Sequence, residues 1–309
     1  MSYDYDCVIV GGGPAGLTAG IYCGRAKIKT LLIEKSIVGG QIALTDLVEN
    51  YPGFPEGISG KELSRRLKNQ AEKFGVNIEK NEAINLYMEG DKKKYILLKD
   101  GKKIKTKSII LALGVRHKKL NVPGEEEFLN RGVSYCATCD GPLFENAEVA
   151  VVGGGDSAVQ ESLFLTKFCK KVYLIHRRDK LRAQKYLQER LFSNEKIEFL
   201  PNRIVLSIEG SNFVERLKIL NKITQKEELL KVQGVFIFIG MEPNTEIVRG
   251  IIELDERGYI VTDSRMRTNI EGVYAVGDCR SGATGQVAVA VGEGCIAGME
   301  VEHYLSNFQ

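Results

Sequence analysis

Short apolar runs alternate with amphipathic stretches along most of the chain, a pattern typical of an α/β protein. Residues 60–74 repeat apolar positions at helical spacing, and residues 84–107 alternate as in a small antiparallel meander. Almost wholly apolar runs predict buried strands, and these are residues 6–10, 30–34 and 108–114 in the first half and residues 148–152, 171–175 and 234–240 in the second.

A glycine-rich loop follows the first strand of each half. The loops read Gly-Gly-Gly-Pro-Ala-Gly at 11–16 and Gly-Gly-Gly-Asp-Ser-Ala at 153–158. In this dinucleotide fingerprint the first glycine permits the turn, the second lets the backbone approach a pyrophosphate, and the third lets helix and strand pack. The surrounding strand–loop–helix–strand order makes an accidental glycine-rich turn the weaker alternative. The predicted nucleotide contacts are Gly11, Gly13, Pro14, Ala15, Gly16, Gly153, Gly155, Asp156, Ser157 and Ala158.

The two halves differ at the position expected to face the ribose. Glu34 ends the second strand of the first half, where an acid accepts hydrogen bonds from ribose hydroxyls. The position at the same distance from the second loop is His176, followed by Arg177 and Arg178, with Arg182 one helical turn further. Arginines bind a 2′-phosphate that an acid would repel. The second site therefore predicts NADP(H), unless the arginines are simply the solvated start of a helix.

Two linkers separate the halves. Residues 115–123 are basic and end in proline, and residues 241–245 are a second loop. We predict two Rossmann-like three-layer ββα dinucleotide-binding domains, the second inserted in the first. The first comprises residues 1–116 and 246–309, and the second residues 117–245. An insertion on two linkers is a hinge geometry.

The last part of the chain returns to the first domain. It contains a predicted strand at residues 258–261, a strand that ends at Gly277 and Asp278, and a helix from about Gln286 to Leu305. Asp278 lies near the first loop in this arrangement and suits a ribityl hydroxyl of FAD. The alternative is that Asp278 caps the last helical region.

Composition narrows the classes of function. The chain has 309 residues, of which 43% are hydrophobic and 27% charged, with a formal net charge of +3. These values favour a soluble globular protein, and the spread of the lysines favours a solvated surface over a nucleic-acid groove. No apolar run approaches a membrane span, and the N-terminus leads directly into a strand, so we expect no signal peptide.

Seven cysteines are present, and only Cys136 and Cys139 are close enough in sequence to act on each other. An odd number with scattered spacing argues against a secreted disulfide framework, and zinc would need a second pair or spaced histidines. A redox-active C-x-x-C pair in a reducing cytoplasm is favoured, with no metal site. The other cysteines are expected to be buried structural thiols, with Cys7 in a strand, Cys23 and Cys169 in helices, and Cys295 in the last helix.

With these motifs in place, the chain resembles the low-molecular-weight thioredoxin reductases from end to end. Besides the two loops, the resemblance rests on Gly39-Gly-Gln41, Glu49-Asn-Tyr-Pro52, Cys136-Ala-Thr-Cys-Asp-Gly141, His176-Arg-Arg-Asp179 with Arg182, and Gly277-Asp278. Two residues depart from the family pattern: Leu113 stands where threonine is usual, and Gly285 where many bacterial members carry a basic residue. Both lie on the side of the flavin site and bear on flavin affinity or exposure.

The resemblance implies a cytoplasmic, homodimeric flavoenzyme in which NADPH supplies electrons through FAD to a Cys136–Cys139 disulfide, and the dithiol then reduces thioredoxin. It implies rotation of the inserted domain between the half-reactions. Cys139 would face the flavin and Cys136 would attack the substrate. Asp140 would serve as acid and base, or alternatively as a helix cap before Pro142. Further FAD and NADPH contacts are implied at Lys35, Gly40, Gln41, Asn50, Gly114, Gly240, Gln286, Val287 and Ala288.

Other functions stay open. A related flavin disulfide reductase with another protein partner or electron donor would share these motifs. A ferredoxin- or flavodoxin-NADP reductase would not need Cys136 and Cys139. A flavin-bound redox sensor would not need two nucleotide sites of opposite ribose chemistry.

Overall fold

The computed structural model describes residues 2–45, 48, 50–90 and 93–308. Internal contacts divide the chain into two compact units. Unit 1 comprises Met1–Arg116 and Glu242–Gln309, and unit 2 comprises His117–Met241. The chain therefore leaves unit 1 after residue 116 and re-enters it at Glu242, ahead of the boundary at residue 246 drawn from the sequence.

Unit 1 is built on a mixed sheet in the order β3-β2-β1-β6-β5-β4, with β17 paired to β6. Strands β1, β2, β3, β6 and β17 run parallel, and β4, β5 and β6 form an antiparallel meander. The strands are β1 Tyr5–Val10, β2 Thr30–Glu34, β3 Asn77–Lys80, β4 Ala83–Glu89, β5 Lys93–Leu98, β6 Lys103–Leu111 and β17 Val273–Ala275.

Strand β6 joins two elements that the sequence pattern separates. The last strand of the meander and the apolar run after it form one continuous strand, Lys103–Leu111. Its first part pairs with β5, where Thr106 is opposite Lys94, and its last part lies between β1 and β17, where Ile110 pairs with Ile9 and Tyr274. The pattern changes from alternating to fully apolar because the end of the strand is buried on both faces.

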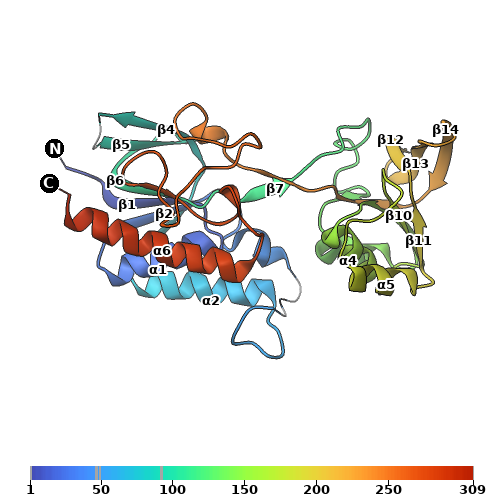
Figure 1. Ribbon diagram of the computed structural model, residues 1–309, viewed down its shortest axis with the longest axis horizontal. Helices are drawn as coiled ribbons and strands as arrows, with labels where there is room; N and C mark the ends of the chain where they lie inside the picture. The colour runs from blue at the N-terminus through green and yellow to red at the C-terminus, as the bar shows by residue number, and fades with distance from the viewer. Residues whose placement is uncertain (1, 46–47, 49, 91–92, 309) are drawn as a thin grey trace. The chain divides into compact units, whose positions relative to one another are not determined.

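Three helices cover one face of the unit 1 sheet (Figure 1). They are α1 Pro14–Arg25, α2 Gly60–Lys73 and α6 Val287–Ser306, with short 3-10 turns η1 Gly40–Leu44, η3 Glu246–Val248 and η4 Gly277–Cys279. Along β1, Cys7 and Ile9 face the helices, whereas Val8 and Val10 face the opposite cluster. Because successive side chains of a strand point to opposite faces of the sheet, β1 contributes to the hydrophobic clusters on both faces.

Glycines allow α1 and α6 to pack closely. A Cβ atom on Gly294 of α6 would lie 2.2 Å from the carbonyl oxygen of Ala15, and one on Gly298 would lie 2.6 Å from Cβ of Tyr22. Since real Cβ atoms do not approach other atoms so closely, both positions require glycine. The start of α1 immediately follows the first glycine loop, so α6 packs directly against that loop.

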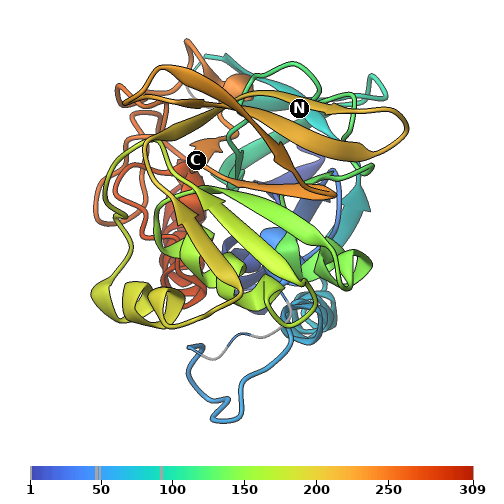
Figure 2. The same cartoon turned by 90° about the vertical axis from the view of Figure 1, so that its right-hand side faces the viewer.

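Unit 2 has a parallel sheet, β11-β10-β9-β15-β8, and an antiparallel sheet, β12-β13-β14. Figure 2 shows the parallel sheet between the antiparallel sheet and the helices. The elements are β8 Val133–Ser134, α3 Ala137–Asp140, η2 Gly141–Phe144, β9 Glu148–Gly153, α4 Asp156–Leu165, β10 Lys171–Ile175, α5 Lys185–Phe192, β11 Ile197–Leu200, β12 Arg203–Gly210, β13 Val214–Asn221, β14 Lys226–Lys231 and β15 Gly234–Phe238. This is the three-layer ββα arrangement predicted from the sequence.

Two predicted elements are wrong. Residues 258–261 are not a strand: Ile260 makes only isolated bridges, to Leu254 and Arg280. Arg182 is not one helical turn beyond Arg178, because α5 begins only at Lys185 and the preceding segment is irregular. For the same reason the alternative of a solvated helix start does not hold for the arginines.

The expectation for the other cysteines holds only in part. Cys7, Cys23 and Cys169 are free and buried, but Cys169 follows α4 in a non-helical segment. Cys295 of α6 is only partly buried.

The two linkers contain short strands that pair with each other. These are β7 Val115–His117 and β16 Met241–Pro243. Within the described ranges, no helix combines the length and apolar character needed to cross a membrane.

Candidate functional site

The first glycine loop has the geometry that its spacing predicts. Gly11 adopts a φ of +108°, and an added Cβ would lie 2.1 Å from the carbonyl oxygen of Ala112. A Cβ on Gly16 would lie 2.0 Å from the carbonyl oxygen of Gly11. At Gly13, in contrast, an added Cβ would meet nothing within 4 Å. The loop is therefore tight at both ends and open in the middle, where a pyrophosphate would approach the backbone.

Glu34 is held beneath this loop. Its Oε2 accepts a hydrogen bond of 2.7 Å from Gly12 N–H, and its Oε1 accepts one of 2.8 Å from Ser36 N–H. The residue is 9% exposed. Two backbone donors thus orient the carboxylate at the carboxyl end of β2, where the sequence places the ribose acceptor. The next residue, Lys35, is exposed.

A second segment lies against the same loop. Gly39 N–H donates to Gly12 O at 2.7 Å, and a Cβ on Gly40 would lie 3.3 Å from Cα of Gly13. Gln41 Nε2 donates to the carbonyl oxygen of Val115 at 2.5 Å. The structure therefore brings Gly40 and Gln41 to the open side of the first loop, together with the end of the sheet.

The chain after β6 ends in a fixed turn. Gly114 has a φ of +61°, and its carbonyl oxygen accepts from Asn244 N–H at 3.1 Å. Asn244 Nδ2 also donates to the carbonyl oxygen of Leu113 at 3.0 Å. Asn244 thus binds both carbonyl groups, one through its backbone and one through its side chain. Since neither bond uses the side chain of residue 113, the turn is held with leucine in place of threonine.

The start of α6 also reaches this region. Asn50 Nδ2 donates to Gln286 Oε1 at 3.0 Å, which joins two residues far apart in sequence. Gln286 directly precedes α6, whose first turn contains Val287 and Ala288. Glu49, part of the same predicted motif as Asn50, lies outside the described residues.

Asp278 lies in η4, directly after β17. Burial raises the pKa of its carboxyl group, and the charge of Glu293 raises it further. Asp278 makes no side-chain hydrogen bond within the described part of the chain. The N-cap of α6 is Gln286, so Asp278 does not cap that helix. A partly buried acid without a partner, at the carboxyl edge of the sheet, suits a ligand hydroxyl.

The second loop repeats the pattern in unit 2. A Cβ on Gly153 would lie 2.4 Å from the carbonyl oxygen of Phe238, whereas one on Gly155 would meet nothing within 4 Å. Asp156 starts α4 and accepts from Gln184 N–H at 2.7 Å and from Gln184 Nε2 at 3.0 Å. Ser157 is exposed and Ala158 is buried against the sheet. Again the middle of the loop is open.

His176 and the segment that carries the arginines lie against this second loop. The ring of His176 packs on Gly154, is 5% exposed, and has an Nε2 atom with no partner among the described residues. Burial lowers its pKa, and the charges of the three nearby arginines lower it further. Arg182 N–H donates to Gly154 O at 2.7 Å, and Arg177 and Arg178 are exposed. The three guanidinium groups therefore come from a segment anchored to the loop itself.

The cysteine segment lies at the start of α3 in the same unit, with Cys136 directly before the helix. Cys136 is disulfide-bonded, and its N–H donates to Ser134 Oγ at 3.0 Å. The side chain of Cys139 lies outside the described part of the structure. Asp140 makes no side-chain capping hydrogen bond to the η2 turn that follows, so helix capping is not its role.

A buried carboxylate anchors the residue before Cys136. Glu125 accepts a hydrogen bond of 2.5 Å from the Tyr135 hydroxyl and bonds of 2.8 and 2.6 Å from the N–H groups of Leu120 and Asn121. Burial raises the pKa of Tyr135, and its hydrogen bond to Glu125 raises it further. The first residues of unit 2 are thereby tied to the segment that carries Cys136.

Comparison with known proteins identifies the family that uses this arrangement. The family model for the pyridine nucleotide-disulphide oxidoreductases matches residues 5–294. The chain belongs to the pyridine nucleotide-disulphide oxidoreductase family. Its two open glycine loops and its disulfide-bonded cysteine are the parts that such an enzyme needs.

Within this family the chain is similar to proteins named thioredoxin reductase. It is 46% identical to that of Bacillus subtilis over 307 residues, covering 99% of this chain and 96% of the relative. It is 44% identical to that of Lactococcus lactis, whose crystal structure matches with a TM-score of 0.93 over 99% of this chain and 100% of that one. The crystal structure of T. acidophilum thioredoxin reductase matches at 35% identity with a TM-score of 0.88, covering 98% of this chain and 99% of that one.

Sequence reasoning did not find several residues that support the sites of this oxidoreductase. Asn244 anchors the turn at Gly114, Glu125 anchors Tyr135, and Glu293 accepts from the turn that carries Asp278. Glu293 gave one usable signal, since it is an acid on the inward side of a glycine-rich, largely apolar helix. The contacts of Asn244 and Glu125 join segments that are separated in the sequence, and their spacing does not indicate that they meet in the fold.

Proposed function

We propose that the chain is an NADPH-dependent thioredoxin reductase that uses FAD and a Cys136–Cys139 pair. The observation that supports it most is the disulfide-bonded Cys136 directly before α3, in a unit that also holds a glycine loop bound by the segment that carries the arginines. The net reaction transfers two electrons and a proton from NADPH, with one further proton from solvent, to the disulfide of thioredoxin. FAD, when bound, supplies a two-electron carrier between nicotinamide and thiol chemistry.

Residues of unit 1 would hold FAD. The open backbone at Gly13 suits its pyrophosphate, Glu34 suits the ribose hydroxyls, and Asp278 suits the ribityl chain. The other proposed FAD contacts in this unit are Gly11, Pro14, Ala15, Gly16, Lys35, Gly40, Gln41, Asn50, Gly114, Gln286, Val287 and Ala288.

Residues of unit 2 would hold NADPH. The arginines at 177, 178 and 182 suit the 2′-phosphate, because guanidinium groups bind phosphate with paired, charge-assisted hydrogen bonds. The unpartnered Nε2 of buried His176 adds a polar atom facing the same loop. The other proposed contacts are Gly153, Gly155, Asp156, Ser157, Ala158 and Gly240.

Thiol exchange assigns separate roles to the two cysteines. Cys136 would attack the thioredoxin disulfide, and Cys139 would resolve the resulting mixed disulfide. Protons must be taken up as thiolates leave, and Asp140, beside the pair and free of a capping role, is proposed as the acid and base. The pair must be shielded to accept electrons and exposed to meet a protein. We therefore propose rotation of the inserted unit about its two linkers between half-reactions.

We further infer that the enzyme is a cytoplasmic homodimer. The buried free thiols Cys7, Cys23, Cys169 and Cys279 fit a reducing compartment, where cysteines persist without pairing. Sedimentation velocity of the FAD-loaded full chain tests the dimer: a single species of one chain would contradict it.

The function is tested with the full chain, FAD and the thioredoxin of the same host. We expect NADPH oxidation that depends on thioredoxin, and loss of that activity in Cys136→Ser and in Cys139→Ser. Both variants should still pass electrons from NADPH to a small acceptor such as ferricyanide, because that path does not need the pair. Cys169→Ser, which changes a buried thiol outside the site, is the matched control and should keep thioredoxin reduction.

Two outcomes would overturn the proposal. Full thioredoxin activity in both active-site variants would remove the pair from the mechanism. Absence of NADPH oxidation with thioredoxin, but turnover with another donor or disulfide protein, would assign the chain to a related disulfide reductase. A chemical cross-link between the units that left turnover intact would contradict the rotation alone.

A further inference from the structure

Three charged residues meet at the turn that carries Asp278. Glu293 of α6 is 4% exposed and accepts from Gly277 N–H at 2.7 Å through Oε2. Its other oxygen, Oε1, accepts from Arg280 Nη2 at 2.6 Å. One buried carboxylate therefore holds the first residue of the short turn Gly277–Cys279 and the residue directly after the turn.

The turn needs such support because its backbone is unusual. Gly277 has a φ of +72°, a left-handed conformation, and an added Cβ would lie 3.2 Å from Cβ of Ala15. Ala15 belongs to the first glycine loop, so the turn packs directly on the proposed pyrophosphate site. A change in the position of Gly277 would therefore move Asp278 relative to that loop.

Arg280 balances the charge of Glu293. Its side chain is 18% exposed, and it also donates to the carbonyl oxygen of Ser281 at 2.9 Å. Without Arg280, the carboxylate of Glu293 would be buried and unpaired beside Asp278, whose pKa burial and Glu293 already raise. A charge of that kind is costly to bury, and it would repel a second carboxylate.

We propose that Glu293 is a positioning residue for FAD, acting through the Gly277 backbone and neutralised by Arg280. This inference rests on the proposed function, since it concerns the site where FAD would bind. Glu293 would not touch the cofactor. It would fix Asp278 in place before FAD arrives, which reduces the ordering that binding must impose.

The test measures FAD dissociation from purified full-length protein after dilution, followed by the rise in flavin fluorescence. Glu293→Ala removes both contacts, so we expect FAD affinity to fall by roughly 10-fold or more, as for loss of a charge-assisted hydrogen bond. Arg280→Met leaves Glu293 buried and unpaired and should weaken FAD binding to a similar extent. The double variant Glu293→Gln with Arg280→Met keeps an acceptor for Gly277 and removes both charges. It should bind FAD more tightly than Arg280→Met alone.

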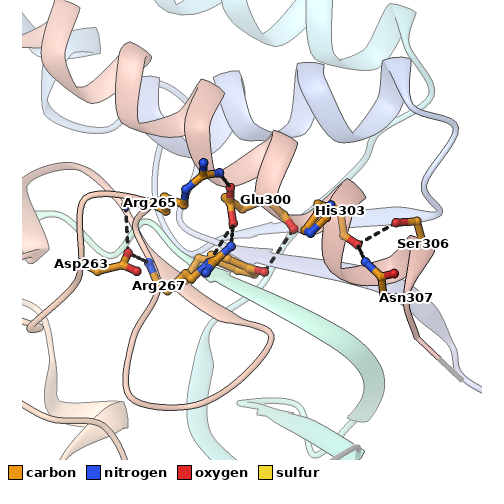
Figure 3. Close-up of polar contacts among 8 residues, drawn as sticks. Asp263, Arg265, Arg267, Glu300, His303, Ser306 and Asn307 are labelled. Carbon is orange, nitrogen blue, oxygen red and sulfur yellow. Dashed lines mark hydrogen bonds and ion pairs between the residues drawn. The ribbon is translucent and has the colours of Figure 1, made fainter.

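Glu300→Gln is the matched control. Glu300 is also an acid buried on α6, and it is held by Arg265 at 2.5 Å and by Arg267 (Figure 3). Within the described residues, no side-chain hydrogen bond or ion pair joins Glu300, Arg265 or Arg267 to the Gly277 turn. The control should lower the thermal unfolding temperature of the protein but leave the FAD dissociation rate unchanged.

The outcomes distinguish a failure of the proposed function from a failure of the role assigned to Glu293. If the wild-type chain does not retain FAD, the proposed function fails and this inference fails with it. If the wild type retains FAD and Glu293→Ala releases it no faster, only the inference is overturned. The inference is also overturned if the double variant is no tighter than Arg280→Met, or if Glu300→Gln releases FAD as fast as Glu293→Ala.

Discussion

The backbone N–H of Arg182 donates to the carbonyl oxygen of Gly154 at 2.7 Å. This contact anchors an irregular segment to the second glycine loop and so presents its arginines beside the helix N-terminus where a nucleotide phosphate would bind. The first loop has Glu34 in the corresponding place, bound to Gly12 N–H. The two loops therefore share a backbone geometry and differ in the charge beside it.

The first prediction concerns this difference in charge. The double substitution Arg177→Ala with Arg178→Ala should raise the KM for NADPH by roughly 10- to 100-fold, since each phosphate contact is a charge-assisted hydrogen bond. The KM for NADH should change by about 2-fold or less, because NADH lacks the 2′-phosphate. Steady-state kinetics with both nucleotides measure this. Arg216→Ala, an exposed arginine of β13 that pairs with Glu209, is the control. Equal loss with both nucleotides would remove the assignment.

The second prediction uses two glycines of α6. Gly294→Ala would place a Cβ 2.2 Å from the carbonyl oxygen of Ala15, so it should destabilise the fold by about 1–3 kcal/mol through overpacking. At Gly292 an added Cβ meets nothing within 4 Å. Gly292→Ala should therefore stabilise by about 0.5–1 kcal/mol, the usual gain for alanine within a helix. Urea unfolding compares the pair, and shifts of the same sign would contradict the helix contact.

The third prediction concerns the pH dependence of stability. Burial raises the pKa of Glu161 on α4 to about 7, so the folded state holds this proton more tightly than the unfolded state does. The contribution of protonated Glu161 to the free energy of unfolding is fully present below the pKa of this group in the unfolded chain. It is lost as the pH rises through about 7. Glu161→Gln, which cannot ionise, should be more stable than wild type by about 1–3 kcal/mol at pH 8. The difference should shrink toward pH 5.

Urea unfolding at both pH values checks this, with Glu189→Gln on the exposed side of α5 as the control. The control should show the same small effect at pH 5 and pH 8. If Glu161→Gln were no more stabilising at pH 8 than at pH 5, the carboxyl of Glu161 would not be neutral in the folded protein.

The fourth prediction concerns Tyr135. Tyr135→Phe removes a donor from Glu125, which is 2% exposed, and should destabilise the protein by about 1–3 kcal/mol. Because Tyr135 directly precedes Cys136, thioredoxin reduction should slow as well. Thermal unfolding and steady-state turnover measure the two effects. Tyr186→Phe, on an exposed tyrosine of α5, should change neither. Unchanged stability in Tyr135→Phe would mean that the Glu125 contact carries no net energy.

Local sequence determined the elements around both loops. Strand β1, helix α1 and strand β2 follow from apolar runs around Gly11–Gly16, a loop in which Gly11 and Gly16 have no room for a Cβ atom. The strand at residues 258–261 failed because Ile260 finds only isolated partners, and no local pattern reveals how much of a neighbouring strand is available. Arg182 was placed on a helix for a similar reason, since polar residues before α5 are compatible with a helix or an irregular segment.

The sequence by itself determined the chemistry that is available: two dinucleotide loops, an acid at Glu34, arginines at 177 and 178, and one close cysteine pair. Each of these features depends on which residues stand close together in the sequence, so it can be recognised without the fold. Only the tertiary structure decided how distant groups complete each site, with Glu293 under Gly277, Asn244 at Gly114 and Gln286 beside Asn50. Such contacts follow from the packing of whole elements, because a hydrogen bond between remote residues forms only once the sheet and helices have fixed their positions.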